Sequence, residues 1–251
     1  AGLWRENSGR MLWMTQPAWP STMWQILSHD YDTHGAYYGT KPASEPVHVK
    51  LNLPNYAVDV INNPAAPLDG ARVAFEAWTV DGRLAGRGAT AVNVAGGGTS
   101  GPIDLGIRPL LEREGLLVVK LVLTDGAGRT VSDNVYWPAA SRERQRGLDA
   151  LASVPVDVRA TGRAQGTTRR VEVTLTNPSK VPLLNTKLTL FTAAGARVLP
   201  VYWSDNYVSL MPGETRTVSA EFDAQTGGQD ALTLAMRAWN SPQRSVPVGA
   251  P

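Results

Sequence analysis

Cysteine is absent from the sequence, and so are long apolar runs. Without cysteine the chain has no disulfide, no thiolate nucleophile and no cysteine-based metal site. No apolar run approaches the roughly 18–20 residues that span a bilayer, so we expect no membrane-spanning segment. We also find no pattern typical of a signal peptide. The sequence opens on Ala1-Gly2-Leu3-Trp4 rather than on methionine, so we expect it to be part of a longer polypeptide.

An excess of charge of one sign is also missing. Lys and Arg number 24 and Asp and Glu number 22, which gives a formal net charge of +2. The basic residues are scattered, and their densest run (Arg142, Arg144 and Arg146) falls in an expected linker. Because a nucleic-acid-binding protein clusters its basic residues on one face, we expect no nucleic-acid partner.

Sequence signals for catalytic residues are few. The chain has neither a Gly-x-Ser-x-Gly nucleophile motif nor a Ser-His-Asp order. Gly96-Gly97-Gly98 falls between expected strands, whereas a phosphate-binding loop precedes a helix. Glu112 and Glu114 flank a charged turn, and nothing indicates a carboxylate pair held in a cleft. We therefore expect no catalytic residue in this chain, and no cofactor.

One cluster has the composition of a metal site, namely His29, Asp30, Asp32 and His34. Asp30 and His34 are four residues apart, so they share one face if this stretch is helical. The solvent face of an amphipathic helix carries the same residue types, and we favour that interpretation and expect no metal. His48 lies within an alternating strand and is expected to be a surface or packed histidine.

Residues 1–45 differ in pattern from the rest of the chain. Residues 10–14 (Arg-Met-Leu-Trp-Met) form a short, mostly apolar run without alternation, which is typical of a parallel strand buried on both faces. Residues 15–20 contain two prolines and predict a loop. A helix is expected to begin at Thr22, which has capping-box spacing to Gln25, and to stop at Gly35. Its apolar stripe is Met23, Trp24, Ile26, Leu27 and Tyr31. The order strand, loop, helix predicts a βα unit.

From Glu45 onward the pattern is that of an all-β chain. Short alternating stretches are separated by turn sequences such as Asp81-Gly82 and Asp125-Gly126. We expect one domain over residues 46–140, a linker over 141–153 and a second domain over 154–251, each of the size of an immunoglobulin-like β-sandwich. Strands are expected at residues 47–53, 57–61, 71–80, 89–94, 116–124 and 130–137, and at residues 154–160, 170–176, 186–192, 198–203, 215–222 and 231–239.

The two β regions show weak signs of a repeat. Alternating valines lead to Asn63-Pro64 in the first region and to Asn177-Pro178 in the second. Pro67-Leu68 or Pro182-Leu183 follows, and then a long strand and a glycine-containing turn. A hairpin shared by two related sandwiches produces this pattern.

Tryptophan is concentrated at the start of the chain. Half of the eight tryptophans are Trp4, Trp13, Trp19 and Trp24. Aromatic rings fill protein cores, and they also stack on the apolar faces of sugar rings. Core packing is the general expectation, but Trp13 lies at the C-terminal end of the expected strand. In a (β/α)8 barrel that end faces the active site.

Four stretches of the sequence resemble one family. Residues 12–21 (Leu-Trp-Met-Thr-Gln-Pro-Ala-Trp-Pro-Ser), with Trp24 following, resemble the eighth barrel strand of glycoside hydrolase family 2. The branch is that of β-mannosidases, exo-β-glucosaminidases and mannosylglycoprotein endo-β-mannosidases. Further landmarks of this branch follow in the same order: Gly35-Ala36-Tyr37-Tyr38-Gly39, then Ser44-Glu45-Pro46-Val47-His48-Val49 with Leu51-Asn52-Leu53, then Asp205-Asn206-Tyr207-Val208-Ser209-Leu210-Met211-Pro212-Gly213-Glu214. The resemblance implies a mainly β chain of two immunoglobulin-like β-sandwiches, preceded by the last βα unit of a (β/α)8 barrel in residues 1–45.

The resemblance also implies a mechanism and partners. It implies a retaining glycosidase with two glutamates about 5–5.5 Å apart, both on earlier barrel strands outside this chain. Trp13 is implied to form the floor of the subsite for the cleaved sugar, with Gln16 and Trp19 at its rim. The implied partners are the N-terminal portion of the same enzyme and a β-linked oligosaccharide, in a periplasmic or secreted enzyme. We expect that partner to cover residues 9–34 and to bury Leu12 and Met14.

Two substrates stay open within the branch. Exo-β-glucosaminidases typically read Leu-Asn-Asn where this chain has Thr15-Gln16-Pro17, and the form Trp-x-Thr-Gln is closer to mannosylglycoprotein endo-β-mannosidases. The sequence therefore favours a β-mannosidic linkage of the N-glycan-core type, with exo-β-D-glucosaminidase activity as the alternative. A different class of function is a non-catalytic carbohydrate-binding β-sandwich protein. Residues 1–45 argue against it, because such a protein has no use for an unpaired βα unit.

Overall fold

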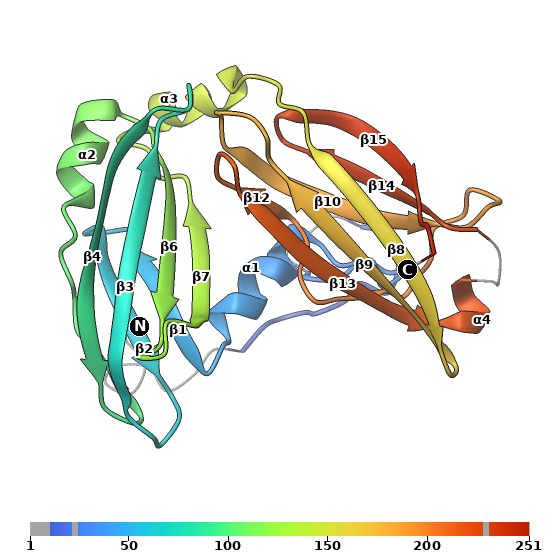
Figure 1. The fold of residues 1–251 in the computed structure, drawn as a ribbon, viewed down its shortest axis with the longest axis horizontal. Helices are drawn as coiled ribbons and strands as arrows, with labels where there is room; N and C mark the ends of the chain where they lie inside the picture. The colour runs from blue at the N-terminus through green and yellow to red at the C-terminus, as the bar shows by residue number, and fades with distance from the viewer. Residues whose placement is uncertain (1–10, 22–24, 228–230, 251) are drawn as a thin grey trace. The chain divides into compact units, whose positions relative to one another are not determined.

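The computed structural model describes residues 11–21, 25–227 and 231–250. The chain divides into two units, one containing residues 40–151 and the other joining residues 12–39 to residues 152–251. Each unit is built on two antiparallel sheets (Figure 1), so the expected mainly β chain of immunoglobulin-like sandwiches is confirmed. Among the described helices, none has the length and apolar character needed to cross a membrane.

The first sandwich packs a three-stranded sheet, β1-β2-β5, with a four-stranded sheet, β4-β3-β6-β7. Its core is formed by inward-facing apolar residues of both sheets, such as Val60, Val73 and Leu121, all fully buried. Alternation along β3 follows the pleat, because its buried alanine, valine and phenylalanine residues are separated by more exposed positions. The strands are β1 (Val47–Asn52), β2 (Ala57–Asn62), β3 (Leu68–Trp78), β4 (Leu84–Val94), β5 (Gly98–Thr99), β6 (Val118–Thr124) and β7 (Thr130–Tyr136).

The second sandwich has two four-stranded sheets, β12-β10-β14-β15 and β11-β13-β9-β8. Leu175, Leu188 and Phe222 are among the side chains that fill the space between these sheets. Phe222 is 1% exposed and lies near the end of β13, the strand that pairs with β9 over its whole length. The strands are β8 (Asp157–Gln165), β9 (Thr168–Thr176), β10 (Leu183–Phe191), β11 (Tyr202–Trp203), β12 (Val208–Leu210), β13 (Thr215–Asp223), β14 (Thr233–Ala238) and β15 (Ser241–Pro247).

Several elements differ from the sequence expectations. The charged turn at Glu112 is the helix α2 (Ile107–Glu114), which lies on the first sandwich through the buried Ile107 and Leu111. The expected linker contains α3 (Arg142–Gln145) and the 3-10 helix η1 (Arg146–Ala150). The strand expected at residues 198–203 is shortened to β11, and β15 was not expected at all. A short helix, α4 (Ala224–Gly227), follows β13.

The βα unit expected in residues 10–34 is not formed in its described part. Residues 11–14 make no strand, and residues 25–34 make no helix. Residue 10 and residues 22–24, including the expected helix start, lie outside the described residues. A parallel strand needs hydrogen-bonded neighbours on both edges, and no described strand pairs with residues 11–14. The expectation that Gly35 stops a helix is wrong, because α1 (Gly35–Ala43) begins there.

A turn replaces the expected helix at residues 28–32. Leu27 and Thr33 form an isolated antiparallel bridge that closes it. The Ser28 hydroxyl donates to Asp30 Oδ1 and accepts from the Asp32 backbone N–H. Serine and aspartate compete with helix formation in this way, because their side chains satisfy nearby backbone groups.

A buried asparagine marks the same place in both sandwiches. In the first, Asn62 Nδ2 donates to the carbonyls of Ala66, Val94 and Ala95 at 2.9, 3.3 and 3.3 Å. In the second, Asn177 Nδ2 donates to the carbonyls of Val181, Leu210 and Met211 at 2.9, 3.1 and 3.3 Å. Each amide therefore bonds to the carbonyl four residues later in its own loop, and it also bonds to carbonyls at the end of another strand. The two sandwiches share this hydrogen-bond pattern. The Asn-Pro sequences suggested that Asn63 is the equivalent of Asn177, but the equivalent residue is Asn62.

Candidate functional site

The three residues implied in sugar binding lie on residues 11–21, a segment without regular secondary structure. The Trp13 side chain is 79% exposed and that of Trp19 is 69% exposed, whereas Pro17 between them is buried. Gln16 is half-buried, and the peptide bond between Trp13 and Met14 is cis. Both tryptophans are thus presented to solvent, on a segment that is anchored between them.

Two hydrogen bonds join this segment to the turn at residues 28–32. The Leu27 N–H donates to the Thr15 carbonyl at 3.0 Å. The Gln16 side chain donates from Nε2 to the His29 carbonyl at 3.1 Å. Gln16 therefore makes a structural contact in this chain, in addition to any contact with a ligand.

Four charged side chains hold the turn to the second sandwich. Lys187 on β10 places its Nζ 2.7 Å from Asp32 Oδ2. Arg197, in the turn after β10, places one guanidinium nitrogen 3.3 Å from the same oxygen and donates another N–H to Asp30. Asp30 and Asp32 therefore serve as ion-pair partners, and the interpretation of this cluster as a helix face is wrong. Among the described residues, no group of three or more His, Asp or Glu side chains is placed to hold a metal ion.

The pKa shifts in this cluster favour the charged forms. Burial opposes ionisation of Asp30, but hydrogen bonds from Ser28 and the Asp32 backbone, with the charge of Arg197, lower its pKa below the usual 3.8. Burial likewise opposes the charge on Lys187, but the hydrogen bond and charge of Asp32 outweigh it and raise the pKa above 10.5. Asp30 thus contributes stability above pH ~3.8 that is lost as the pH falls through its lower folded pKa. Lys187 contributes stability below pH ~10.5 that is lost as the pH rises through its higher folded pKa.

Next to these ion pairs, an aromatic contact at the start of α1 also attaches this part of the chain to the second sandwich. The rings of Tyr38 and Tyr207 have centroids 5.9 Å apart, and Tyr38 is only 6% exposed within the core of the second sandwich. The Tyr38 hydroxyl lies 2.8 Å from Thr33 Oγ1, and burial raises the pKa of Tyr38 well above its usual 10. A Cβ added at Gly35 would lie 3.5 Å from Tyr207 Cδ1, so the backbone of α1 runs close to that ring.

The stretch from Asp205 to Glu214 builds the other side of this contact. Asn206 is 3% exposed and pairs with the Leu188 backbone as a strand residue does, accepting from its N–H at 2.8 Å and donating to its carbonyl at 3.0 Å. Tyr207 follows with φ of 55°, in the left-handed region that favours glycine and is uncommon for tyrosine. Glu214 Oε2 accepts from the Met211 N–H at 2.9 Å and closes the following turn. Two family landmarks, around residues 37 and 207, therefore meet in space, which no local sequence signal indicated.

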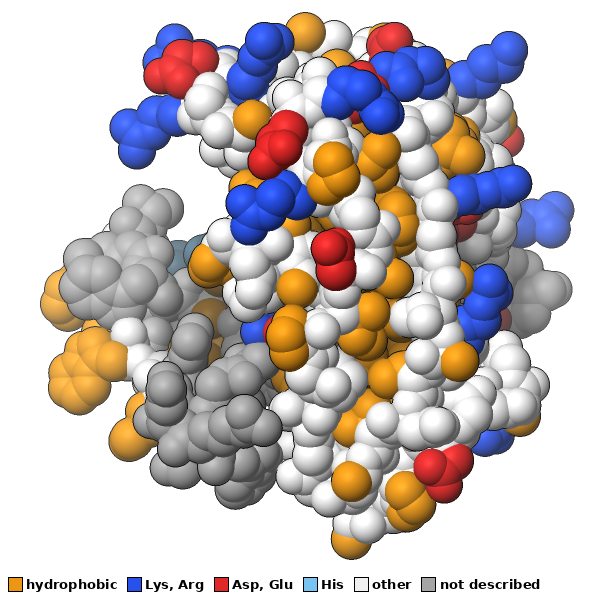
Figure 2. Space-filling view, turned by 90° about the vertical axis from the view of Figure 1, so that its left-hand side faces the viewer, with side chains coloured by type: hydrophobic (Ala, Val, Ile, Leu, Met, Phe, Trp, Pro, Cys, Tyr) orange, Lys and Arg blue, Asp and Glu red, His pale blue; other side chains and the backbone are white. Residues whose placement is uncertain are grey.

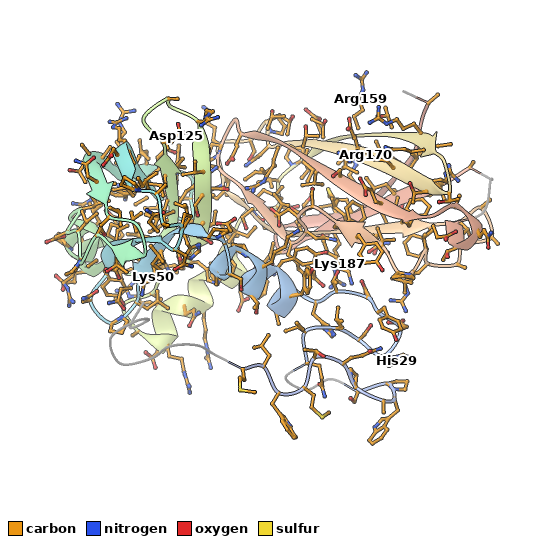
Figure 3. All side chains as sticks on the ribbon, turned by 90° about the horizontal axis from the view of Figure 1, so that it is seen from below. His29, Lys50, Asp125, Arg159, Arg170 and Lys187 are labelled. Atoms are coloured by element: carbon orange, nitrogen blue, oxygen red, sulfur yellow. The ribbon has the colours of Figure 1, made fainter. Side chains whose placement is uncertain are left out.

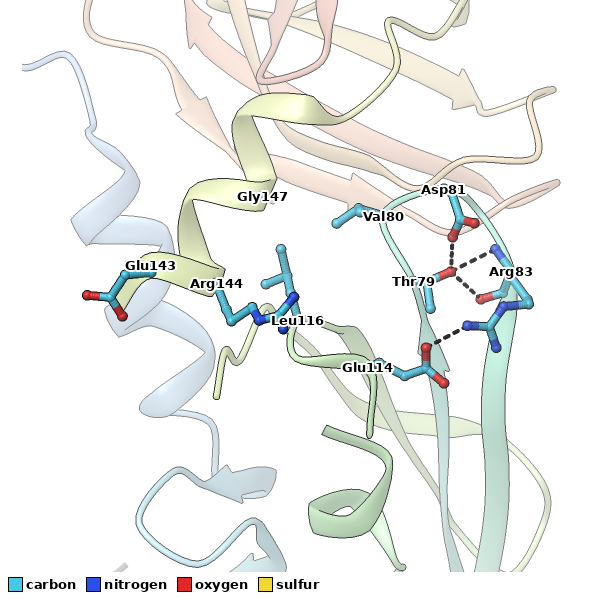
Figure 4. Close-up of a pocket in the computed structure, with 9 residues that line it drawn as sticks. All are labelled: Thr79, Val80, Asp81, Arg83, Glu114, Leu116, Glu143, Arg144 and Gly147. Carbon is cyan, nitrogen blue, oxygen red and sulfur yellow. Dashed lines mark hydrogen bonds and ion pairs between the residues drawn. The ribbon is translucent and has the colours of Figure 1, made fainter. Parts of the chain in front are cut away.

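A polar pocket of about 420 Å³ lies in the first sandwich, lined by Thr79, Arg83, Glu114, Glu143, Arg144 and others (Figure 4). The Glu114 carboxylate accepts from Arg113 and from Arg83, the latter at 2.5 Å, and these bonds lower its pKa. Backbone N–H bonding and the Ser141 side chain lower the pKa of Glu143, whose carboxylate points away from Glu114. A glycosidic general acid needs a raised pKa, so these glutamates do not make a catalytic pair.

Charges elsewhere on the first sandwich are mixed. Figure 2 shows Lys and Arg side chains interspersed with Asp and Glu on the face it presents. His48 on β1 is 5% exposed and lies 3.5 Å from Glu45 Oε2, and burial lowers its pKa. His48 is therefore a packed histidine, one of the two settings expected for it.

Limited proteolysis tests the contrast between the exposed segment and the sandwiches. We expect chymotrypsin to cut first within residues 11–14, after Trp13 or a neighbouring Leu or Met, because these exposed residues lie outside any sheet. Cleavage within the strands requires cooperative unfolding, so it should be slower by about 100-fold or more. Mass spectrometry of the early products checks this, and first cuts inside either sandwich would contradict it.

Comparison with known proteins relates this chain to a group of enzymes. Residues 134–241 match the family described as the exo-β-D-glucosaminidase Ig-fold domain. An exo-β-D-glucosaminidase of Streptomyces avermitilis is 32% identical over 96% of the chain and 29% of its own length. A mannosylglycoprotein endo-β-mannosidase of Lilium longiflorum is 25% identical over 95% of the chain and 31% of its own length. The crystal structure of the Amycolatopsis orientalis exo-chitosanase CsxA is similar over 94% of this chain and 30% of that one, at 29% identity and a TM-score of 0.83.

The chain thus spans less than a third of the length of each of these relatives. Both kinds of enzyme belong to the branch that residues 12–21 and the three later landmarks resemble. Similarity over nearly the whole chain, at high structural agreement, confirms that resemblance. The chain is therefore similar, over nearly its whole length, to a part of exo-β-D-glucosaminidases and of a mannosylglycoprotein endo-β-mannosidase.

Proposed function

We propose that this chain is the C-terminal portion of a retaining β-glycosidase that removes β-linked glucosamine residues. The observation that carries the proposal is the similarity, over 94–96% of the chain, to proteins named as exo-β-D-glucosaminidase or exo-chitosanase. The match of residues 134–241 to the Ig-fold domain of exo-β-D-glucosaminidases supports the same substrate class. The two catalytic glutamates that the family resemblance implies lie outside this chain.

In this proposal the chain contributes to sugar binding through residues 11–21. Trp13 offers an indole face on which the apolar face of a pyranose ring stacks, and Trp19 and Gln16 border it. Stacking of this kind holds the ring at the position where the carboxylates act, so it increases kcat/KM without taking part in bond breaking. The exposed positions of both tryptophans agree with this role.

The partner we propose is the remainder of the catalytic barrel. Met11 is 97% exposed, Leu12 47% and Met14 42%, and together with Trp13 they form an uninterrupted apolar stretch. Leaving such side chains in water costs roughly 1.5–3 kcal/mol each relative to burial, and contiguous exposed apolar residues are typical of interfaces. Flanking strands of the barrel would bury Leu12 and Met14, and they would supply hydrogen-bonded neighbours for residues 11–14, with which no described strand pairs.

A β-mannosidic substrate is the second candidate. Thr15-Gln16-Pro17 is closer to the endo-β-mannosidase form than to the form typical of exo-β-glucosaminidases. The relative from Lilium longiflorum supports this candidate at lower identity than the glucosaminidases.

Hydrolysis of two chromogenic substrates distinguishes the candidates. The polypeptide at its full natural length, with any chain that co-purifies with it, would be assayed on p-nitrophenyl β-D-glucosaminide and p-nitrophenyl β-D-mannoside. We expect kcat/KM to be higher for the glucosaminide by about tenfold or more, because a site that binds the amino group disfavours a substrate without one. A preference for the mannoside would select the second candidate, and no hydrolysis of either would contradict the glycosidase proposal.

The 251-residue chain by itself should hydrolyse neither substrate, because both catalytic carboxylates lie outside it. The same assays at high protein concentration check this expectation. Turnover by the pure chain that is abolished by Glu114→Gln would contradict it, since Glu114 lines the polar pocket described above.

A further inference from the structure

The turn at residues 28–32 connects the exposed segment, residues 11–21, with charged side chains of the second sandwich. Its two carboxylates, on Asp30 and Asp32, face Lys187 and Arg197. The carboxylates and the Lys187 ammonium are largely shielded, with side-chain exposures of 26% for Asp30, 21% for Asp32 and 29% for Lys187. Partly buried ion pairs with hydrogen-bonding geometry are screened less than fully exposed ones.

The cluster fixes the turn at two points rather than one. Arg197 bonds both carboxylates, so it resists rotation of the turn, and Lys187 fixes the distance of Asp32 from β10. The Lys187 ammonium also lies 5.8 Å from the centroid of the Tyr207 ring, where cation–π attraction operates. Tyr207 in turn packs on Gly35 and Tyr38, which follow the turn directly. The ionic and aromatic contacts therefore form one continuous joint.

The position of the turn passes to the exposed segment through the two hydrogen bonds already described. Thr15 accepts from Leu27, and Gln16 donates to His29. These two residues lie within three positions of Trp13. Displacement of the turn therefore displaces Trp13 and Gln16 together.

We propose that Lys187, Arg197 and Tyr207 of the second sandwich are positioning residues that set the place of the segment bearing Trp13, Gln16 and Trp19. The sandwich acts on this segment without touching a ligand itself. The inference rests on the proposed function only in naming what the segment binds. The second sandwich would then position the exposed segment in addition to forming its own core.

Arg170, on the same sandwich, is a suitable site for a control variant (Figure 3). Lys187 lies on the side facing the segment that carries His29, and Arg170 lies on the opposite side. Arg170 forms ion pairs with Glu221 at 2.5 Å and with Glu172 at 3.5 Å. Arg170→Met therefore removes one positive charge and two ion pairs from the sandwich without altering the contacts of Lys187 and Arg197.

Hydrogen–deuterium exchange of the 251-residue chain tests the joint itself. In Lys187→Met/Arg197→Met, which keeps the long side-chain stems, we expect the amides of Leu27, Ser28 and His34 to exchange about tenfold faster or more. Amides of β9 should keep their wild-type rates, and Arg170→Met should leave all of them unchanged. Asp32→Asn added to Lys187→Met should accelerate exchange less than the two separate effects combined, because both substitutions break the same Asp32–Lys187 ion pair. Unchanged exchange at Leu27, Ser28 and His34 in the double variant would overturn the proposal.

Steady-state kinetics test whether these residues affect catalysis through the segment that bears Trp13. In the active protein at its natural length, Lys187→Met/Arg197→Met should lower kcat/KM for p-nitrophenyl β-D-glucosaminide about fivefold or more, whereas Arg170→Met should leave it unchanged. Faster exchange together with an unchanged kcat/KM would overturn the positioning role. Failure of the proposed function is seen separately, as absence of hydrolysis by the unmodified protein.

Discussion

Replacement of Trp13 by alanine should lower kcat/KM of the active protein about tenfold or more, with little change in melting temperature. A stacking platform contributes about 1–3 kcal/mol to holding the sugar in its reactive position, and that free energy appears in kcat/KM. The Trp13 side chain is 79% exposed in this chain, so its removal takes little from either sandwich core. Steady-state kinetics with p-nitrophenyl β-D-glucosaminide, alongside thermal unfolding, measures both quantities.

Tyr202→Ala is the matched control for this prediction. Tyr202 is 72% exposed on β11, so the variant also removes a large exposed aromatic ring, but from a strand rather than from residues 11–21. Its kcat/KM should equal that of the unmodified protein. If Trp13→Ala has no larger effect than Tyr202→Ala, Trp13 does not stack on the substrate.

Asn177→Ala should cause a large loss of stability in the second sandwich. The Asn177 side chain is fully buried and donates to three carbonyls. Its removal leaves these acceptors without that donor in a dry environment, so we expect the free energy of unfolding to fall by about 2–4 kcal/mol. Urea titration of the 251-residue chain, followed by far-ultraviolet circular dichroism, gives this value.

Asn62→Ala provides the comparison in the first sandwich. Because Asn62 has the same three-carbonyl pattern, the same range of destabilisation is expected there, and the transition of the second sandwich should not move. Asn177→Asp keeps the shape but replaces the donor by an acceptor, so it should cost at least as much as Asn177→Ala. A loss below about 1 kcal/mol in Asn177→Ala would mean that water replaces the amide at little cost.

The strands were predictable because their side chains alternate. β1 and β9 lie within one or two residues of the expected ranges, since each has an apolar face on its own core and a polar face outside. α2 was missed because it is short and contains Pro109, although proline is tolerated in a first helical turn. β15 was missed because its residues are mostly exposed and do not alternate clearly.

The attachment of residues 12–39 to the second sandwich was not predictable from local patterns. It depends on ion pairs between residues far apart in sequence, such as Asp32 with Lys187, and neither residue carries a local sign of its partner. The resemblance of residues 35–39 and 205–214 to one family placed both stretches in one enzyme, yet it did not indicate that they touch. The turn at residues 28–32 was read as a helix because its apolar spacing fits one, while Ser28 and Asp32 satisfy the backbone differently.

A crystal structure of the active protein with a bound monosaccharide, glucosamine or mannose, would show whether Trp13 binds the sugar. We expect the Trp13 indole to lie about 4 Å from the sugar ring, the separation of stacked groups in contact. We also expect Leu12 and Met14 to be buried between strands that lie outside this chain, with Asp32 still paired to Lys187. A sugar bound elsewhere, with Trp13 in solvent and Leu12 and Met14 uncovered, would contradict these expectations.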